Sequence, residues 1–190
     1  MKWLIPALLL VVVSFLVPTA HAQTYPAAEI FGGYSFVSFD AGGGDRLSMH
    51  GFNAAVTGNA NRWFGVVGDL SWHRAGTCEG FAGVTCSHSS FAAGPQITVR
   101  GSQASGFVRG LFGVDHAGIG AGALGLTASI TDNTFLAGLG GGVDVRATPL
   151  VSIRAIQIDY LTTNHFSNLG ADRQHSVRIS AGVVFTLARR

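Results

Sequence analysis

The last apolar stretch of the chain alternates between two kinds of side chain. Val177 and Phe185 share one parity, and Arg178 and Ser180 share the other. Successive side chains of a strand point to opposite faces, so this alternation predicts a strand with one apolar and one polar face. Val184 is the one exception in this segment.

Seven other segments show the same alternation, some of them more loosely. The eight predicted strands cover residues 29–39, 48–59, 64–73, 89–100, 105–116, 134–146, 150–162 and 176–187.

Two of the predicted strands carry an irregularity. Pro95 has no N–H to donate to a ladder, which predicts a bulge or a distorted edge. Arg154 and Asp159 have opposite parity, so they can face the same side only if one residue is bulged.

The connections between these strands alternate between short and long. Short links fall near residues 60–61, 101–103 and 147–149, and long ones near 40–46, 74–88, 118–132 and 164–174. This order predicts an antiparallel, up-and-down barrel of eight strands. In outer membrane barrels the short turns and both termini lie in the periplasm, and the long loops lie outside the cell.

The first residues differ from the rest of the chain. Lys2 precedes an apolar run, and Ala20-His21-Ala22 offers the small residues that a signal peptidase reads. We therefore predict a signal peptide over residues 1–22 and a barrel domain over 23–190. The alternative, a retained membrane helix, needs roughly 20 apolar residues, and this run is shorter.

The charged residues decide between a membrane barrel and a soluble one. Only 12% of the chain is charged, against 27 glycines in 190 residues. A soluble, lipocalin-like barrel would point its charges outward. Here the charges gather on the parity that holds Gly and Ser, which predicts a polar lumen, because an Arg at the lipid-facing midplane costs roughly 2–4 kcal/mol. The predicted lumen charges are Glu29, Asp69, Arg100, Arg109, Asp144, Arg146, Arg154, Asp159 and Arg178.

An eight-stranded barrel is only wide enough for side chains to fill. Unpaired buried charge is costly, so we expect the inward arginines and carboxylates to pair and close the lumen. This predicts a structural, surface-interaction protein without a wide channel. A narrow pore or transport-related barrel is the alternative.

Cys78 and Cys86 lie eight positions apart in a polar segment. In an exported protein this predicts a disulfide that closes a loop. A metal pair is the alternative, but the spacing lacks a second pair of ligands.

Other functional classes find little support. A net charge of +2 without a basic stripe gives no case for nucleic acid. Residues 120–125 match a dinucleotide-binding pattern by letter but lack its strand–turn–helix context, so we interpret them as a glycine-rich loop without a cofactor.

Residue types that a lipid A-modifying hydrolase would need are also present. They are Asp69, Ser71, His73, Asp115 and His116. We interpret these as lumen or rim polar residues and expect no catalysis.

Several ordered segments resemble small bacterial outer membrane β-barrel proteins related to the transmembrane domain of outer membrane protein A. They are residues 29–35, 51–53, 61–66, 140–144, Arg154 with 159–160, and 178–185. The resemblance implies an assembly signal for the barrel insertion machinery, although the usual final aromatic residue is absent. Its residues are Ser180, Gly182, Phe185 and Leu187. It also implies periplasmic chaperones during export; we expect a monomer in outer membrane lipids with an unidentified extracellular ligand.

Overall fold

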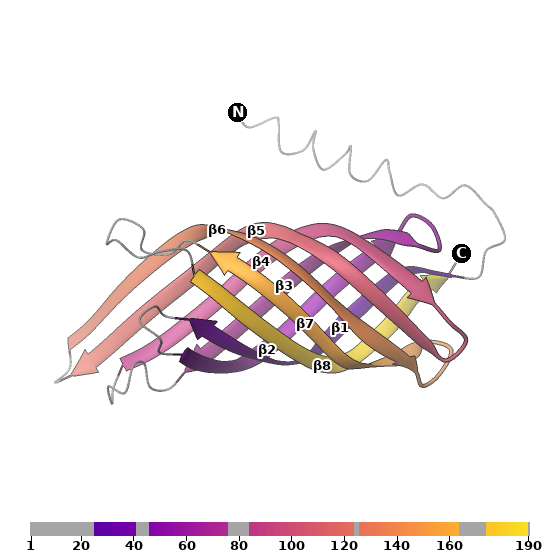
Figure 1. The fold of residues 1–190 in the computed structure, drawn as a ribbon. Coiled ribbons are helices and arrows are strands. Elements are labelled where there is room, and N and C mark those ends of the chain that lie inside the picture. Colours follow the sequence, from indigo (N-terminus) through magenta and orange to yellow (C-terminus); the bar gives the residue numbers. More distant parts are fainter. Residues whose placement is uncertain (1–24, 41–45, 76–83, 124–125, 164–173, 190) are drawn as a thin grey trace, which may run out of the picture.

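A computed structural model describes residues 25–40, 46–75, 84–123, 126–163 and 174–189, which form a closed antiparallel barrel (Figure 1). Each strand pairs with its neighbour in the chain, and the last pairs with the first. The eight-stranded, up-and-down prediction is confirmed. The strands are β1 (Pro26–Asp40), β2 (Arg46–Asn59), β3 (Phe64–Ala75), β4 (Val84–Arg100), β5 (Ala104–Ala123), β6 (Leu126–Arg146), β7 (Val151–Thr163) and β8 (Gln174–Arg189). Within the described residues there is no helix long and apolar enough to cross a membrane.

The two faces of the sheet are as the alternation predicts. On β3, Val66 and Leu70 are about half exposed, while Val67 and Asp69 are buried. On β6, Leu139 is 71% exposed to the outside of the barrel. Apolar side chains therefore coat the cylinder, and the ionic side chains of these strands lie within it.

The lumen also holds an apolar cluster that the sequence did not predict. Each strand contributes one buried side chain to it: Phe31, Ala55, Val67, Ala92, Leu111, Leu136, Leu161 and Val184. The predicted polar lumen, with its ion pairs, is therefore present together with an apolar layer. Eight strands leave space only for side chains, and aliphatic groups fill the part that ion pairs do not occupy.

The bulge predicted in β7 is present. Asp144 of β6 pairs with Arg154, but the next pair joins Val143 to Ile156, so Ala155 is the extra residue. The pairing of β7 with β8 shifts at the same place. Arg154 and Asp159 consequently both face the lumen, with exposures of 4% and 0%.

Pro95 distorts the sheet without shifting its register. The pairing of β4 with β5 stops after Ala93 and Phe112 and resumes, in the same register, at Gln96 and Arg109. A missing N–H accounts for the lost ladder bonds.

The loop predicted over residues 118–132 is wrong. β5 continues to Ala123 and β6 begins at Leu126, with unbroken pairing from Ala117–Asp132 to Ala123–Leu126. These two strands extend furthest from the rest of the barrel (Figure 1). Glycine lowers strand propensity, but a long hairpin partner supplies the backbone hydrogen bonds that hold such residues in a sheet.

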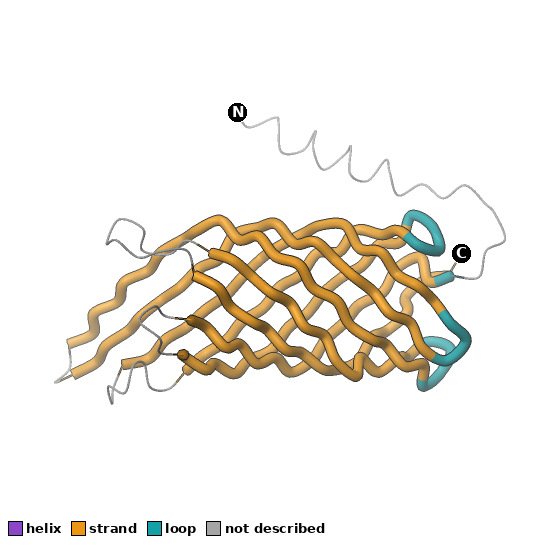
Figure 2. Tube along the Cα trace, viewed as in Figure 1, coloured by secondary structure: helices purple, strands orange, loops and turns teal. Residues whose placement is uncertain are grey.

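Three short turns gather at one end of the barrel, together with the end of β8 (Figure 2). We call this end the short-turn rim. Side chains satisfy the turn backbones there: Asn61 Oδ1 accepts from the backbone N–H groups of Trp63 and Phe64 at 2.8 and 2.9 Å. The Thr148 hydroxyl accepts from the Val151 N–H at 3.0 Å. Asn and Thr favour such turns because their side chains can replace a backbone acceptor.

Candidate functional site

Four ionic side chains from four strands meet in the middle of the lumen. They are Asp69 of β3, Arg109 of β5, Asp159 of β7 and Arg178 of β8, none more than 2% exposed. We call them the central ion cluster. Two positive and two negative charges make the cluster electrically neutral.

Every member of the central ion cluster contacts two partners of opposite charge. Arg109 Nη2 lies 3.0 Å from Asp69 Oδ2 and 3.0 Å from Asp159 Oδ2. Arg178 Nη1 lies 2.8 Å from Asp69 Oδ1, and its Nε donates to Asp159 Oδ2 at 3.0 Å. Removing water from four charges is costly, and only such close, multiple pairing offsets that cost. Removal of any one member would therefore leave buried charges of the other sign with fewer partners.

Two amides connect this cluster to the next layer. Asn53 Nδ2 donates to Asp69 Oδ2 at 3.0 Å, and Gln157 Nε2 donates to Asp159 Oδ2 at 2.8 Å. Gln157 Nε2 also donates to Asn53 Oδ1 at 3.0 Å. Arg154 Nη1 in turn donates to Gln157 Oε1 at 2.6 Å. Asn53 and Gln157 thus connect the central ion cluster to Arg154 by a continuous series of hydrogen bonds.

Arg154 forms an ion pair between the central ion cluster and the short-turn rim. Its Nε and Nη2 donate to the two carboxylate oxygens of Asp144 at 2.8 and 3.0 Å. Its guanidinium carbon lies 4.3 Å from the ring centroids of both Phe31 and Phe107. A guanidinium interacts favourably with aromatic faces, so the two rings further stabilise this buried cation.

The remaining predicted lumen charges lie toward the short-turn rim. Arg100 Nη2 donates to Glu29 Oε2 at 3.1 Å, and both side chains are partly exposed. Arg146 is exposed, and its Nη1 donates to the Ser102 carbonyl at 2.9 Å instead of to a carboxylate. The structure thus divides the nine residues into the central ion cluster, two separate ion pairs and one arginine at the rim.

The half of the lumen away from the short-turn rim holds histidines and hydroxyl groups. His73 Nε2 lies 2.9 Å from Ser35 Oγ, which accepts a hydrogen bond from Ser180. His88 Nε2 lies 2.6 Å from Asp115 Oδ2. No group of three metal-ligating side chains with suitable geometry occurs in the part of the chain that the structure describes.

The candidate hydrolase residues lie in different places. Asp69 belongs to the central ion cluster, and Ser71 Oγ lies 2.7 Å from the hydroxyl of Ser90. His116 is on the outer face, 2.7 Å from Asn133 Oδ1. His73 contacts Ser35 and not Ser71, since alternation separates residues 71 and 73 along one face. Asp69, Ser71 and His73 therefore contact other residues and not one another.

Two other predictions concern the connections and the ends. Cys86 is buried near the start of β4, and Cys78 lies outside the described residues, so their disulfide stays a prediction. The predicted signal peptide also lies outside the described residues. In the predicted assembly signal Ser180 faces the lumen, and Phe185 and Leu187 are 50% and 60% exposed on the outside.

Sequence reasoning missed several residues that complete the lumen. Asn53, Gln157 and His88 are buried polar residues on inward parity, and that parity was the only signal that could have found them. By residue type alone, Phe31 and Phe107 would be expected on the outward face of the barrel. Their contact with Arg154 depends on strand stagger and barrel closure, which residue type does not encode.

A family model described as "outer membrane protein beta-barrel domain" matches residues 7–185. The chain belongs to this family. It is therefore a bacterial outer membrane β-barrel, and its exposed apolar face is the lipid-facing one. In this family's orientation the short-turn rim faces the periplasm. No curated protein sequence matches the chain significantly.

Solved structures show the same fold at low sequence identity. Ail, the attachment invasion locus protein of Yersinia pestis, is 21% identical with a TM-score of 0.60, over 83% of this chain and 97% of that one. Neisserial surface protein A is 12% identical with a TM-score of 0.68, over 87% and 99%. OprG of Pseudomonas aeruginosa is 14% identical with a TM-score of 0.51, over 86% and 96%. At this identity the likeness is one of fold.

Proposed function

We propose that this barrel is a closed anchor whose exterior connections interact with partners outside the cell. The central ion cluster is the observation that carries the proposal. Its four side chains are buried, mutually paired and drawn from opposite sides of the barrel, so they occupy the path that a solute would take. If the lumen is closed, two features of the barrel remain available for a function. They are its anchoring in the outer membrane and the long connections outside the cell.

The named relatives support a role at the surface. Two of them are described as an attachment invasion locus protein and a surface protein. Ail is also known in complex with the heparin analogue sucrose octasulfate, at 21% identity and a TM-score of 0.59. A sulfated polysaccharide is therefore a reasonable first probe for this chain.

Planar-bilayer recording tests the closed lumen. Purified barrel should insert without producing large, stable conductance, while a wide-bore porin in the same bilayer gives its usual open channel. Reproducible open currents from the folded barrel would contradict the anchor and favour the narrow-pore alternative, which the histidine and hydroxyl groups of the outer lumen support.

Cell binding tests the surface role. A Gram-negative host that displays the barrel should bind heparin-coated beads or cultured animal cells more than the same host without it. Replacing residues 76–83 or 164–173 by Gly-Ser linkers of equal length should reduce that binding, with barrel folding checked by heat-modifiable gel migration. Binding that persists after both replacements would contradict the proposal.

Lipid A analysis tests the proposed absence of catalysis. Lipid A from hosts with and without the barrel should give the same mass spectrum. A loss or gain of one acyl chain that depends on the barrel would identify an enzyme instead.

A further inference from the structure

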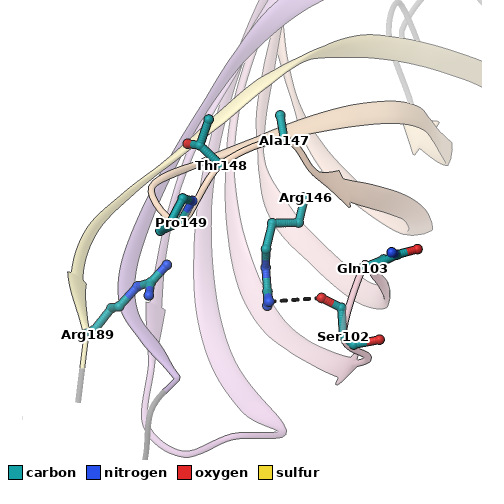
Figure 3. Close-up of a pocket in the computed structure, with 7 residues that line it drawn as sticks. All are labelled: Ser102, Gln103, Arg146, Ala147, Thr148, Pro149 and Arg189. Atoms are coloured by element: carbon teal, nitrogen blue, oxygen red, sulfur yellow. Dashed lines mark hydrogen bonds between the residues drawn. The ribbon is translucent and has the colours of Figure 1, made fainter.

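A cavity of about 330 Å³ opens at the periplasmic, short-turn rim (Figure 3). Its walls come from three neighbouring parts of the rim: the β4–β5 turn with Ser102, the end of β6 with Arg146, and the end of β8 with Arg189. Thr148 of the β6–β7 turn completes it. Segments that are far apart in sequence thus bring two guanidinium groups to one small space.

These two arginines differ from the four arginines that pair with carboxylates within the lumen. Arg146 is held by a hydrogen bond from its Nη1 to the Ser102 carbonyl, 2.9 Å away. Among the described residues, no carboxylate lies within ion-pair distance of Arg146 or Arg189, whereas Arg100, Arg109, Arg154 and Arg178 each contact one. Two cations that share a cavity repel each other unless an anion lies between them.

Exposed apolar residues lie close in the chain to two residues of the cavity, Pro149 and Arg189. Leu150, next to Pro149, is 58% exposed, and Leu187 of β8 is 60% exposed. Arg189 is exposed at the end of β8, two residues beyond Leu187. Acyl chains lie against these apolar side chains, so the phosphates of the periplasmic leaflet lie at the level of the cavity.

We propose that this cavity binds the phosphate group of an anionic glycerophospholipid from the periplasmic leaflet. The two guanidinium groups pair with the phosphate, and the Ser102 hydroxyl supplies a further donor within the same wall. A zwitterionic headgroup brings an ammonium group toward the two arginines, which disfavours it. The single negative charge of the bound phosphate offsets one of the two arginine charges at the rim, beside the seam where β8 meets β1.

Native mass spectrometry of the folded full barrel tests this site. Barrel in detergent is offered equal amounts of phosphatidylglycerol and phosphatidylethanolamine with identical acyl chains. We expect the wild type to retain phosphatidylglycerol preferentially. The double variant Arg146→Gln/Arg189→Gln should bind it about tenfold less tightly, as expected when charge-assisted contacts are lost.

Arg62→Gln is the matched control for the single variant Arg189→Gln. Arg62 is also an exposed rim arginine, but it stacks on Trp63 at 4.6 Å and does not line the cavity. We expect Arg189→Gln to weaken lipid retention and Arg62→Gln to leave it unchanged, with heat-modifiable migration showing that both fold. Equal losses from both variants, or equal retention of the two lipids by the wild type, would overturn the proposal. Displacement of the lipid by excess inorganic phosphate would identify a free-anion site instead and also overturn it.

Discussion

Gly140 of β6 lies directly opposite Asp159 of β7, and the absence of a side chain on Gly140 makes room for that carboxylate. A Cβ at residue 140 would overlap Asp159 Oδ1 and would lie 2.9 Å from the Ile158 carbonyl oxygen. The next inward glycine along the strand has the same relationship to an aromatic ring, since a Cβ on Gly142 would lie 2.8 Å from Phe107 Cζ. Inward glycines of β6 therefore set how far lumen side chains can reach.

Gly140→Ala should destabilise the barrel by about 1–3 kcal/mol, the usual cost of overpacking a dense interior. Asp159 cannot move aside cheaply, because Arg109, Gln157 and Arg178 all bind it. Urea unfolding of the protein in detergent measures the change. Gly68→Ala is the control, since no atom lies within 4 Å of a Cβ there. Equal effects of the two substitutions would contradict this account.

Asp159→Asn should lower the free energy of unfolding by about 3–5 kcal/mol, the range for breaking a buried ion pair by removing one partner. The substitution keeps the side-chain shape but leaves Arg109 and Arg178 with Asp69 as their shared carboxylate. Its control is Glu29→Gln, which removes a carboxylate from a partly exposed pair and should cost about 1 kcal/mol or less. The same unfolding titration compares them. If Glu29→Gln costs as much as Asp159→Asn, burial is not what makes the central ion cluster important.

The sequence predicts the strands and their faces well, because alternation is a local property. The outward row with Leu139 and the inward position of Asp69 could both be identified without the structure. The bulge near Ala155 also follows locally, from the opposite parity of two inward charges. The long β5–β6 hairpin could not be predicted this way, since its glycines resemble a loop until a paired partner strand is known.

The partners within the lumen were the other part that sequence could not supply. Arg109 and Asp159 are 50 residues apart, and Gln157 and Asn53 are 104 apart. Which side chains meet depends on barrel closure and strand stagger, which no single strand determines. Parity therefore identifies inward residues but does not assign their contacts, as the exposed position of Arg146 shows.

Cys78 and Cys86 should be joined by a disulfide in protein purified from the outer membrane. The prediction depends on export to an oxidising compartment, where disulfides form and persist. Alkylation in denaturant should modify neither cysteine before reduction and both after it. Modification without a reductant, or a metal ion released by a chelator, would contradict the disulfide.

Deletion of Ala155 should leave a folded barrel, whereas deletion of Ile158 should not. Ala155 is the extra residue of the bulge, so its removal joins two regular stretches and keeps Arg154 on the inward face. Ile158 lies within regular pairing. Its loss shifts the alternation, so that residues on one side of the deletion exchange their inward and outward positions. Arg154 or Asp159 would then turn toward lipid, at roughly 2–4 kcal/mol for an arginine at the midplane, and its lumen partners would be left unpaired. Heat-modifiable gel migration of both deletions after refolding measures the difference. If the Ile158 deletion migrates as a folded barrel and the Ala155 deletion does not, the bulge has a structural role other than bringing both charges into the lumen.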